Sequence, residues 1–211
     1  MIIAIDGPAA AGKGTLARRI AGALGLPYLD TGLLYRATGR LVLDAGGDPA
    51  KVEDAARAAN ALRETDLGRG DLRGAEADRA ASQVASIPAV RAALLDYQRD
   101  YGRKNGAVLD GRDIGTIVFP NADIKLFVTA SLEARAARRH RELVLRGEAM
   151  ALEEVRADLA ARDEADRNRK AAPLKPAEDA TVFDTTDMDA DAAFARALAL
   201  IKAARGFPDK N

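Results

Sequence analysis

A glycine-rich loop near the start of the chain carries residue types that suit phosphate binding. Gly7 and Gly12 flank its first part, and Lys13, Gly14 and Thr15 follow directly. Glycines let the backbone curl so that successive N–H groups point at phosphate oxygens. A lysine at this spacing reaches the β- and γ-phosphates of a nucleoside triphosphate, and a nearby hydroxyl helps to hold Mg²⁺. The residues predicted to bind ATP here, with Thr15 as the candidate Mg²⁺ ligand, are Gly7, Pro8, Ala9, Ala10, Ala11, Gly12, Lys13, Gly14 and Thr15.

The elements expected on either side of this loop agree with that interpretation. Residues 2–5 form an apolar, β-branched run typical of a buried strand, and residues 16–24 have helical spacing. Strand, glycine-rich turn, lysine, hydroxyl and helix together make a P-loop, in which the helix N-terminus also attracts phosphate. Gly14 stands where the general pattern has Ser or Thr, an ending that resembles nucleoside monophosphate kinases more than GTPases or motor ATPases. The alternative is a turn that binds nothing.

Composition excludes several classes of function. The chain has 211 residues, a formal net charge of zero, no cysteine and one histidine. This length suits one domain with a full core, and zero net charge argues against nucleic acid or an anionic membrane as a partner. Disulfides, cysteine-ligated metals and histidine-cluster metal sites are ruled out. Because no run approaches about 18 apolar residues and the first residues look like a core strand rather than a signal peptide, we expect a soluble, cytoplasmic enzyme.

Short apolar runs of β-type composition recur along the chain, separated by longer stretches at helical spacing. This alternation predicts an α/β fold with a five-stranded parallel sheet and helices on both faces, in a single domain over residues 1–211. A break at residues 146–148 in a charged helical stretch predicts a hinged lid over about 145–168, and a last helix is expected over about 189–204. The predicted strands are 2–5, 27–29, 107–109, 124–128 and 181–183.

Polar residues follow the second and third predicted strands. Thr31 and Arg36 come after the second, and Arg112 and Asp113 come after the third. Because ligands of parallel sheets bind beyond the carboxyl ends of the strands, we interpret these residues as parts of one site. Arginine suits phosphoryl transfer, since its planar fork grips phosphate oxygens in pairs and stays charged.

A charged stretch nearer the C-terminus offers further candidates. Arg162, Asp166 and Arg169 fall on one face if residues 162–169 are helical. For an isolated helix, a solvated face held by salt bridges is the favoured interpretation. Phosphoryl transfer beside a P-loop favours a binding role instead, because that reaction needs positive charge placed around the moving group.

The acceptor of the phosphoryl group is less constrained than the donor. The sequence offers no obvious His or Cys as a base, which agrees with an acceptor that is already an anion, such as a monophosphate oxygen. A sugar hydroxyl would need a carboxylate close to it, and Asp113 or Asp30 could serve. A small-molecule alcohol therefore stays open as the acceptor.

Several separate blocks, in order along nearly the whole chain, resemble the cytidylate kinase family. Beyond the P-loop they include an Asp-Thr-Gly segment, an Ala-Ser-Gln-Val-Ala segment, and the run Asp-Gly-Arg-Asp-Ile-Gly-Thr. Together they are far more specific than a P-loop alone. The matching blocks are residues 5–15, 30–36, 81–91, 110–120, 162–169 and 172–174.

The resemblance implies a P-loop kinase that uses ATP and Mg²⁺ to phosphorylate CMP or dCMP, and that is a monomer. Ser82, Arg91 and Asp113 would read the cytosine edge, and Arg138 with the lid would cover ATP. Arg162 and Asp166 resemble the residues on the ribose side. Lys13, Arg36, Arg112 and Arg169 would be catalytic. The substrate-binding residues implied in this way are Thr31, Arg36, Ser82, Arg91, Arg112, Asp113, Arg162, Asp166 and Arg169.

Two departures from the family pattern stand out. The arm expected to bind the monophosphate, about 33–105, has a short, charged and glycine-rich stretch at 62–76 where relatives usually carry a small β-rich insert. We hypothesise that this trimmed arm closes less tightly and discriminates less well between bases. Relatives often have a further arginine where Ala165 stands, so one nucleotide contact is expected to be missing.

Other functions were weighed against this one. Within enzymes, the chain could be a kinase of UMP or of an alcohol. Outside enzymes, it could be a P-loop binding switch or an ATPase associated with nucleic acid. A GTPase switch needs an Asn-Lys-x-Asp motif, which the sequence lacks, and zero net charge argues against a nucleic-acid protein.

Overall fold

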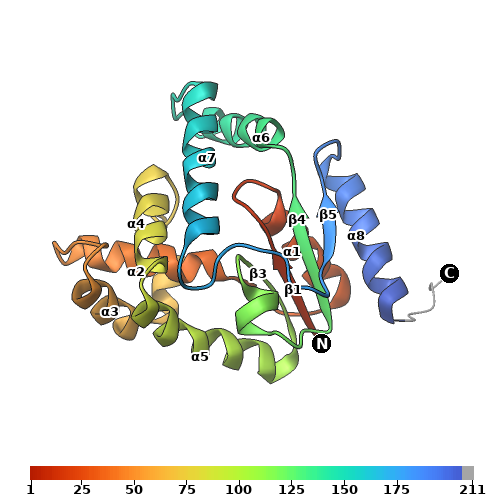
Figure 1. Cartoon of the computed structure of the whole chain (residues 1–211), viewed down its shortest axis with the longest axis horizontal. Coiled ribbons are helices and arrows are strands. Elements are labelled where there is room, and N and C mark those ends of the chain that lie inside the picture. Colours follow the sequence, from red (N-terminus) through yellow and green to blue (C-terminus); the bar gives the residue numbers. More distant parts are fainter. Residues whose placement is uncertain (206–211) are drawn as a thin grey trace.

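The computed structural model describes residues 1–205 as a parallel sheet with helices packed around it (Figure 1). The strands are β1 (Ile2–Asp6), β2 (Tyr28–Asp30), β3 (Ala107–Gly111), β4 (Ile124–Thr129) and β5 (Thr181–Asp184). The α-helices are α1 (Lys13–Leu24), α2 (Thr31–Asp44), α3 (Val52–Ala61), α4 (Ala75–Ala85), α5 (Pro88–Asn105), α6 (Leu132–Leu145), α7 (Leu152–Asn168) and α8 (Ala190–Arg205). A 3-10 helix, η1 (Glu64–Gly68), and a π-helical turn, η2 (Ile114–Val118), complete the described elements.

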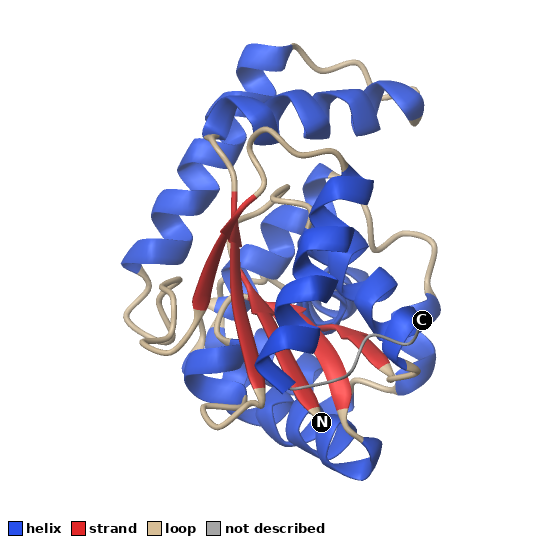
Figure 2. Ribbon diagram, turned by 90° about the vertical axis from the view of Figure 1, so that its right-hand side faces the viewer, coloured by secondary structure: helices blue, strands red, loops and turns tan. Residues whose placement is uncertain are grey.

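The sheet has five strands in the order β2-β3-β1-β4-β5, and every pair is parallel. The predicted five-stranded parallel α/β fold is therefore confirmed, and each predicted strand lies within two residues of an observed one. β1 is the central strand, so the loop that leaves its carboxyl end lies in the middle of the sheet edge. Figure 2 shows the strands running side by side between helices, with further helices beyond one end of the sheet.

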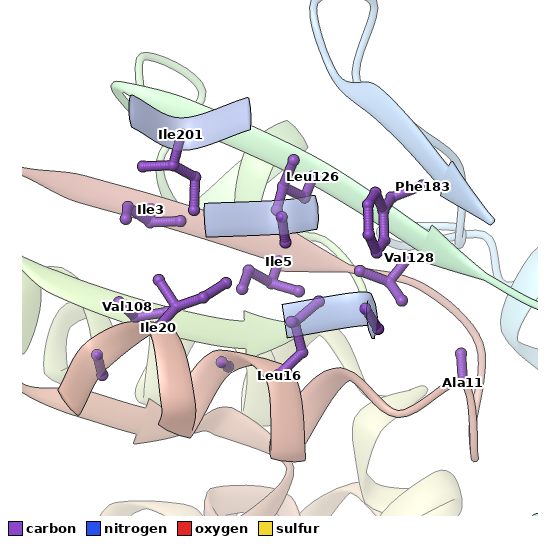
Figure 3. Packing of buried hydrophobic residues seen from close by; sticks show 14 residues of the cluster. Ile3, Ile5, Ala11, Leu16, Ile20, Val108, Leu126, Val128, Phe183 and Ile201 are labelled. Carbon is purple, nitrogen blue, oxygen red and sulfur yellow. The ribbon is translucent and has the colours of Figure 1, made fainter. Parts of the chain in front are cut away.

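Successive side chains of β1 and β3 point to opposite faces of the sheet, so the apolar core is divided into two layers. Ile3 and Ile5 pack with Leu16 and Ile20 of α1 and with Ile201 of α8 on one face (Figure 3). Each is at most 4% exposed, and burying such a side chain contributes roughly 1.5–3 kcal/mol. This face fixes α1, and with it the P-loop, against the central strand.

The opposite face of the sheet is covered by α5 and by η2. Ala4, Leu109 and Ile114 are buried there with Val118, and Tyr101 of α5 packs against them. Helices thus lie on both faces, as the sequence predicted. The phosphate-binding loop and the segment after β3 are positioned by two separate apolar layers.

Helices α2 to α5 form an arm between β2 and β3, with its own apolar core. Leu34, Val84 and Leu94 are among its buried residues. Gly39 lets α2 and α4 approach closely, since a Cβ there would lie 2.8 Å from the Cβ of Ala80. The stretch 62–74 between α3 and α4 holds η1 and no strand, which agrees with the expected absence of a β-rich segment.

Helices α6 and α7 form a helical pair between β4 and β5. They pack on each other and on Ala9 of the P-loop through Ala136, Val155 and Leu159. The expected break after residue 145 is present, because Gly147 has φ +75° and reverses the chain. No described helix within residues 1–205 is both long and apolar enough to cross a membrane.

Candidate active site

The P-loop joins β1 to α1 and needs glycine at both of its bends. Gly7 has φ +146°, and a Cβ there would lie 1.9 Å from the carbonyl oxygen of Val128 on the neighbouring strand β4. Gly12 has φ +85° at the N-terminus of α1, which begins at Lys13. The first N–H groups of a helix have no partner within the helix and are available to phosphate oxygens.

Lys13 is buried, and its charge is incompletely compensated. Its Nζ donates a hydrogen bond of 2.7 Å to the carbonyl oxygen of Pro8, a neutral acceptor in its own loop. Burial, followed by repulsion from Arg112, holds the pKa of the Lys13 ammonium below its usual range, while Asp110 opposes that shift. A bound phosphate would supply the missing negative charge.

Asp6, the last residue of β1, fixes the segment that follows β3. Its carboxylate accepts hydrogen bonds of 2.7 Å from the backbone N–H groups of both Ile114 and Gly115. Burial raises the pKa of Asp6 to about 6, although these two hydrogen bonds favour the charged form. The carboxylate thereby positions Asp113 and Arg112 beside the P-loop. Sequence analysis missed this residue, and the only signal was an acid that ends an apolar run.

Two of the residues expected to read the base lie together. Arg91 of α5 forms an ion pair with Asp113, and both side chains are largely buried. The Arg91 guanidinium also lies over the ring of Tyr35, 5.6 Å from its centroid, and Tyr35 packs against the arm core. Ser82, the third residue of that set, lies on the neighbouring helix α4.

Asp166 of α7 joins two of the expected phosphate-binding arginines. It accepts a hydrogen bond of 2.8 Å from Nε of Arg112, and Nη1 of Arg169 lies 3.6 Å away. Burial alone would raise the pKa of Asp166, but the charges of Arg112 and Arg169 outweigh it and hold the pKa low. One detail of the sequence analysis is corrected here. Helix α7 ends at Asn168, and Arg169 has extended backbone, so 162–169 is not wholly helical.

The start of α2 is fastened to β3, and Arg36 projects from its second turn. Nη2 of Arg36 donates 2.9 Å to the Asp30 carboxylate. The Thr31 hydroxyl donates 2.8 Å to the backbone carbonyl of Asp110, and the Tyr28 hydroxyl donates 2.9 Å to the Asp110 carboxylate. Burial and the nearby Asp30 raise the pKa of Asp110. The Thr31 side chain is therefore committed to holding the fold, and its expected contact with substrate stays a prediction.

Three arginines of this region have buried donors without a partner. The Nε groups of Arg36, Arg162 and Arg169 are buried, and none of them donates a hydrogen bond to an acceptor in the protein. A buried unpaired donor is costly, and for a charged group the cost is larger. Phosphate oxygens are acceptors that fit the guanidinium fork. The arrangement therefore has spare donors of the kind that an oxyanion satisfies.

Arg138 lies on α6 and holds the loop that follows β5. Its guanidinium donates to the hydroxyl of Thr185 (3.1 Å) and to the carbonyl oxygen of Met188 (3.2 Å). The Thr185 hydroxyl in turn lies 3.3 Å from the carbonyl oxygen of Ala11 in the P-loop. Arg138 thus reaches the P-loop through this loop, and its direct contact with ATP stays a prediction.

Two charged residues outside the predicted set belong to the same cluster. Asp78 of α4 lies near Arg36 and Arg162, and it accepts a hydrogen bond of 3.1 Å from Arg139 of α6. Neither Asp78 nor Arg139 stands out in a sequence with 32 acidic and 32 basic residues. Only the fold, which brings Asp78 of α4 within ion-pair distance of α6 and α7, places them at the site.

The described residues offer oxygen ligands for a hard cation only together with a nucleotide. Within residues 1–205 there is no group of three or more His, Cys, Asp or Glu side chains that could hold a metal ion. Thr15, in the first turn of α1, is exposed. Its hydroxyl is an oxygen donor of the type that Mg²⁺ accepts alongside phosphate oxygens and water. The site thus fits a cation that arrives bound to phosphates.

Comparisons with solved structures agree with the architecture. An uncharacterised protein from Eubacterium ventriosum aligns over 96% of this chain and 99% of its own, with a TM-score of 0.56 and 13% sequence identity. At that identity the likeness shows the fold alone.

Comparisons at the level of sequence identify the family. The family profile described as "Cytidylate kinase" matches residues 3–203. The cytidylate kinase of Granulibacter bethesdensis is 64% identical over 202 residues, which cover 96% of this chain and 97% of the relative. That of Acidiphilium cryptum is 64% identical over 201 residues, with 95% of each chain covered. The expected resemblance is confirmed, and this chain belongs to the cytidylate kinase family.

Proposed function

We propose that the chain transfers the γ-phosphoryl group of ATP to CMP or dCMP, giving ADP and CDP or dCDP. Membership of the cytidylate kinase family supports the reaction. The observation that carries the site assignment is the set of buried, unpartnered Nε groups on Arg36, Arg162 and Arg169. These donors suit the phosphates of two nucleotides held end to end.

The P-loop is proposed to hold the donor nucleotide. Lys13 would exchange its bond to the Pro8 carbonyl for the β- and γ-phosphates, and the first N–H groups of α1 would bind the same oxygens. Thr15 is the proposed protein ligand of Mg²⁺, which when bound neutralises charge on those phosphates. Arg138 would stabilise the loop that covers ATP.

The acceptor phosphate is proposed to lie between Arg36, Arg112 and Arg169. Three cations around the transferring group would bring two anions into line and stabilise the charge that spreads over the moving phosphoryl group. A CMP phosphate oxygen is already ionised and needs no base. Asp30 and Asp113, the two carboxylates that could activate an alcohol, are each paired with an arginine, which favours a phosphate acceptor over a hydroxyl.

The cytosine edge is proposed to meet Asp113, Arg91 and Ser82. The 4-amino group of cytosine is a donor that suits the Asp113 carboxylate, whereas N3 and O2 are acceptors that suit Arg91 and Ser82. UMP presents an acceptor at position 4 and leaves the carboxylate unpaired. That mismatch costs roughly 1–3 kcal/mol, about tenfold or more in discrimination.

The deciding experiment is ADP production from MgATP with CMP, dCMP, UMP, AMP or GMP, each measured against a blank without acceptor. We expect strong turnover with CMP and dCMP, weak turnover with UMP, and none with AMP or GMP. Preference for another nucleotide would still show that the chain is a kinase, but it would overturn the proposal that Ser82, Arg91 and Asp113 read the cytosine edge. Turnover that ignores every acceptor would point to a binding switch.

Replacing Arg112 with Ala tests the phosphate clamp. Loss of one charged donor to the transferring group should lower kcat by a factor of about 100 or more. The measurement is steady-state turnover with CMP, together with urea unfolding to show that the variant is folded. Arg103→Ala, which removes an exposed arginine of α5, is the matched control and should turn over normally. Near-normal turnover in folded Arg112→Ala would refute the role.

A further inference from the structure

The carboxylate of Asp78 faces three guanidinium groups from three different helices. Nη2 of Arg139 on α6 lies 3.1 Å from it, Nη1 of Arg162 on α7 lies 3.4 Å away, and Nη1 of Arg36 on α2 lies 3.9 Å away. The Asp78 side chain is 25% exposed, and the three arginine side chains are 18–25% exposed. A single negative charge thus compensates parts of three positive ones.

Two of these arginines keep donors that the protein does not use. Arg36 and Arg162 each keep a buried Nε without a partner, and Arg162 is held only at the long distance of 3.4 Å. Burial, followed by repulsion from the neighbouring Arg112, also lowers the pKa of Arg162, while Asp78 and Asp166 oppose that shift. An anion with more oxygens than a carboxylate would satisfy these donors better.

The same contacts connect two separately packed parts of the molecule. Asp78 belongs to the arm, where α4 packs along α2, whereas Arg139 and Arg162 belong to the α6–α7 pair. Figure 1 shows α4 beside α7, and the ion pairs of Asp78 with Arg139 and Arg162 connect the two parts of the molecule. Both ion pairs end on Asp78, so one carboxylate ties the α6–α7 pair to the arm.

We propose that Asp78 is a positioning residue that substitutes for a phosphate group in the nucleotide-free enzyme. It holds the α6–α7 pair against the arm through Arg139 and Arg162, and it keeps these arginines and Arg36 close to the positions where nucleotide phosphates will meet them. Incoming phosphates take over the arginines from the carboxylate. Asp78 therefore holds the α6–α7 pair against the arm before a nucleotide binds, but it also lowers the affinity for the nucleotide. It does so because its carboxylate competes with the phosphates for the arginines and repels them.

The closure part of this proposal is tested by a distance measurement that does not depend on activity. The chain has no cysteine, so single cysteines at the exposed positions Glu53 of α3 and Glu148, between α6 and α7, can be spin-labelled selectively. Without nucleotide, Asp78→Asn should show a longer and broader distance distribution than the parent. With MgADP and CMP added, both should give the same short distance. An unchanged distribution in nucleotide-free Asp78→Asn would overturn the proposal.

The competition part is tested by separating KM from kcat. A carboxylate within several ångströms of a bound phosphate weakens its binding by roughly three- to tenfold at intermediate effective dielectric, so Asp78→Asn should lower the KM for CMP by about that factor. We expect kcat to fall or stay constant, because CDP leaves more slowly. If the role of Asp78 were purely structural, Asp78→Asn would raise the KM for CMP and lower kcat together. A raised or an unchanged KM would therefore overturn the proposed competition between Asp78 and the phosphates.

Two further variants control these measurements. Asp71→Asn removes the same charge from the same arm, but Asp71 pairs with Arg69 and Arg40 within the arm, so distance and KM should stay at the parent values. Asp78→Glu keeps the charge and should restore the short nucleotide-free distance. The competition test rests on the proposed function, whereas the distance test does not. Absence of CMP-dependent turnover in the parent would therefore refute the function and leave the closure result standing.

Discussion

At the scale of single residues, buried carboxylates do much of the positioning in this protein. Asp6, Asp113 and Asp166 each bind groups from a different part of the chain, whereas several arginines keep a buried donor without a partner. The arginines were predictable because each stands in a recognisable block after a strand or in the charged stretch before residue 173. The direct ion pairs of these arginines were not: the resemblance places Arg91 and Asp113 at one base-binding site, but only the fold shows that they bind each other across 22 residues of sequence.

Asp6 should give the folded state a distinctive dependence on pH. Its pKa is about 6 in the folded protein and 3.8 ordinarily, so the folded state binds more protons between these values. Stability from this group therefore rises as pH falls from 7 to 5, by about 1 kcal/mol. The measurement is the free energy of urea unfolding of the parent and of Asp6→Asn at both pH values. The free energy of unfolding of the parent, relative to that of Asp6→Asn, should rise by that amount between pH 7 and pH 5. If the difference between the two free energies is the same at both pH values, the raised pKa of Asp6 is contradicted.

At the scale of elements, α6 is connected to α7, to β4 and to the P-loop through one buried side chain. Arg135 pairs with Asp163 on α7 at 2.6 Å and donates to the carbonyl oxygens of Ala130 and Ala9. Both charged side chains are 4% exposed. The sequence indicated two charged helices at this place, but not that one charged pair lies between them, because helical periodicity does not distinguish a buried arginine from its exposed neighbours.

Breaking this buried pair should be far more costly than breaking a surface pair. Asp163→Asn leaves the Arg135 charge buried and uncompensated, so the free energy of unfolding should fall by about 3–5 kcal/mol. Asp191→Asn removes the partner of Arg19, where the carboxylate is 88% exposed, and should cost less than about 1 kcal/mol. Urea unfolding at neutral pH compares the two. Equal losses would show that the Arg135–Asp163 pair does not stabilise the fold as described.

At the scale of the whole molecule, the parallel sheet, its five strands and its helices on both faces could be predicted because apolar strand runs alternate with helical stretches. The internal packing of the arm and the contact of the α6–α7 pair with the P-loop could not, because they depend on close approaches between distant segments, such as Gly39 to Ala80 and Ala9 to Ala136. The short stretch 62–74 is the one large-scale feature with a predicted effect on specificity, since it gives the arm η1 and no strand.

We expect this short arm to discriminate between CMP and UMP less well than an arm with a β-rich insert. Fewer contacts would hold the arm closed around the base, so the penalty for a mismatched base would be only partly expressed. The measurement is the ratio of kcat/KM for CMP to that for UMP, compared with a family member that has the insert. A ratio equal to or larger than that of the comparison enzyme would remove the hypothesis.

The strand order also places the two large insertions of the chain on opposite sides of the sheet. The arm is inserted between β2 and β3, and the α6–α7 pair between β4 and β5, on opposite sides of the central strand β1. The proposed acceptor site nevertheless takes residues from both sides of the sheet, because Arg36, Ser82 and Arg91 belong to the arm whereas Arg112, Asp113 and Arg169 lie outside it. An arm recombined from a relative should therefore change acceptor preference only if its own residues still fit Arg112, Asp113 and Arg169, and if its helix equivalent to α4 still presents a carboxylate to Arg139 and Arg162.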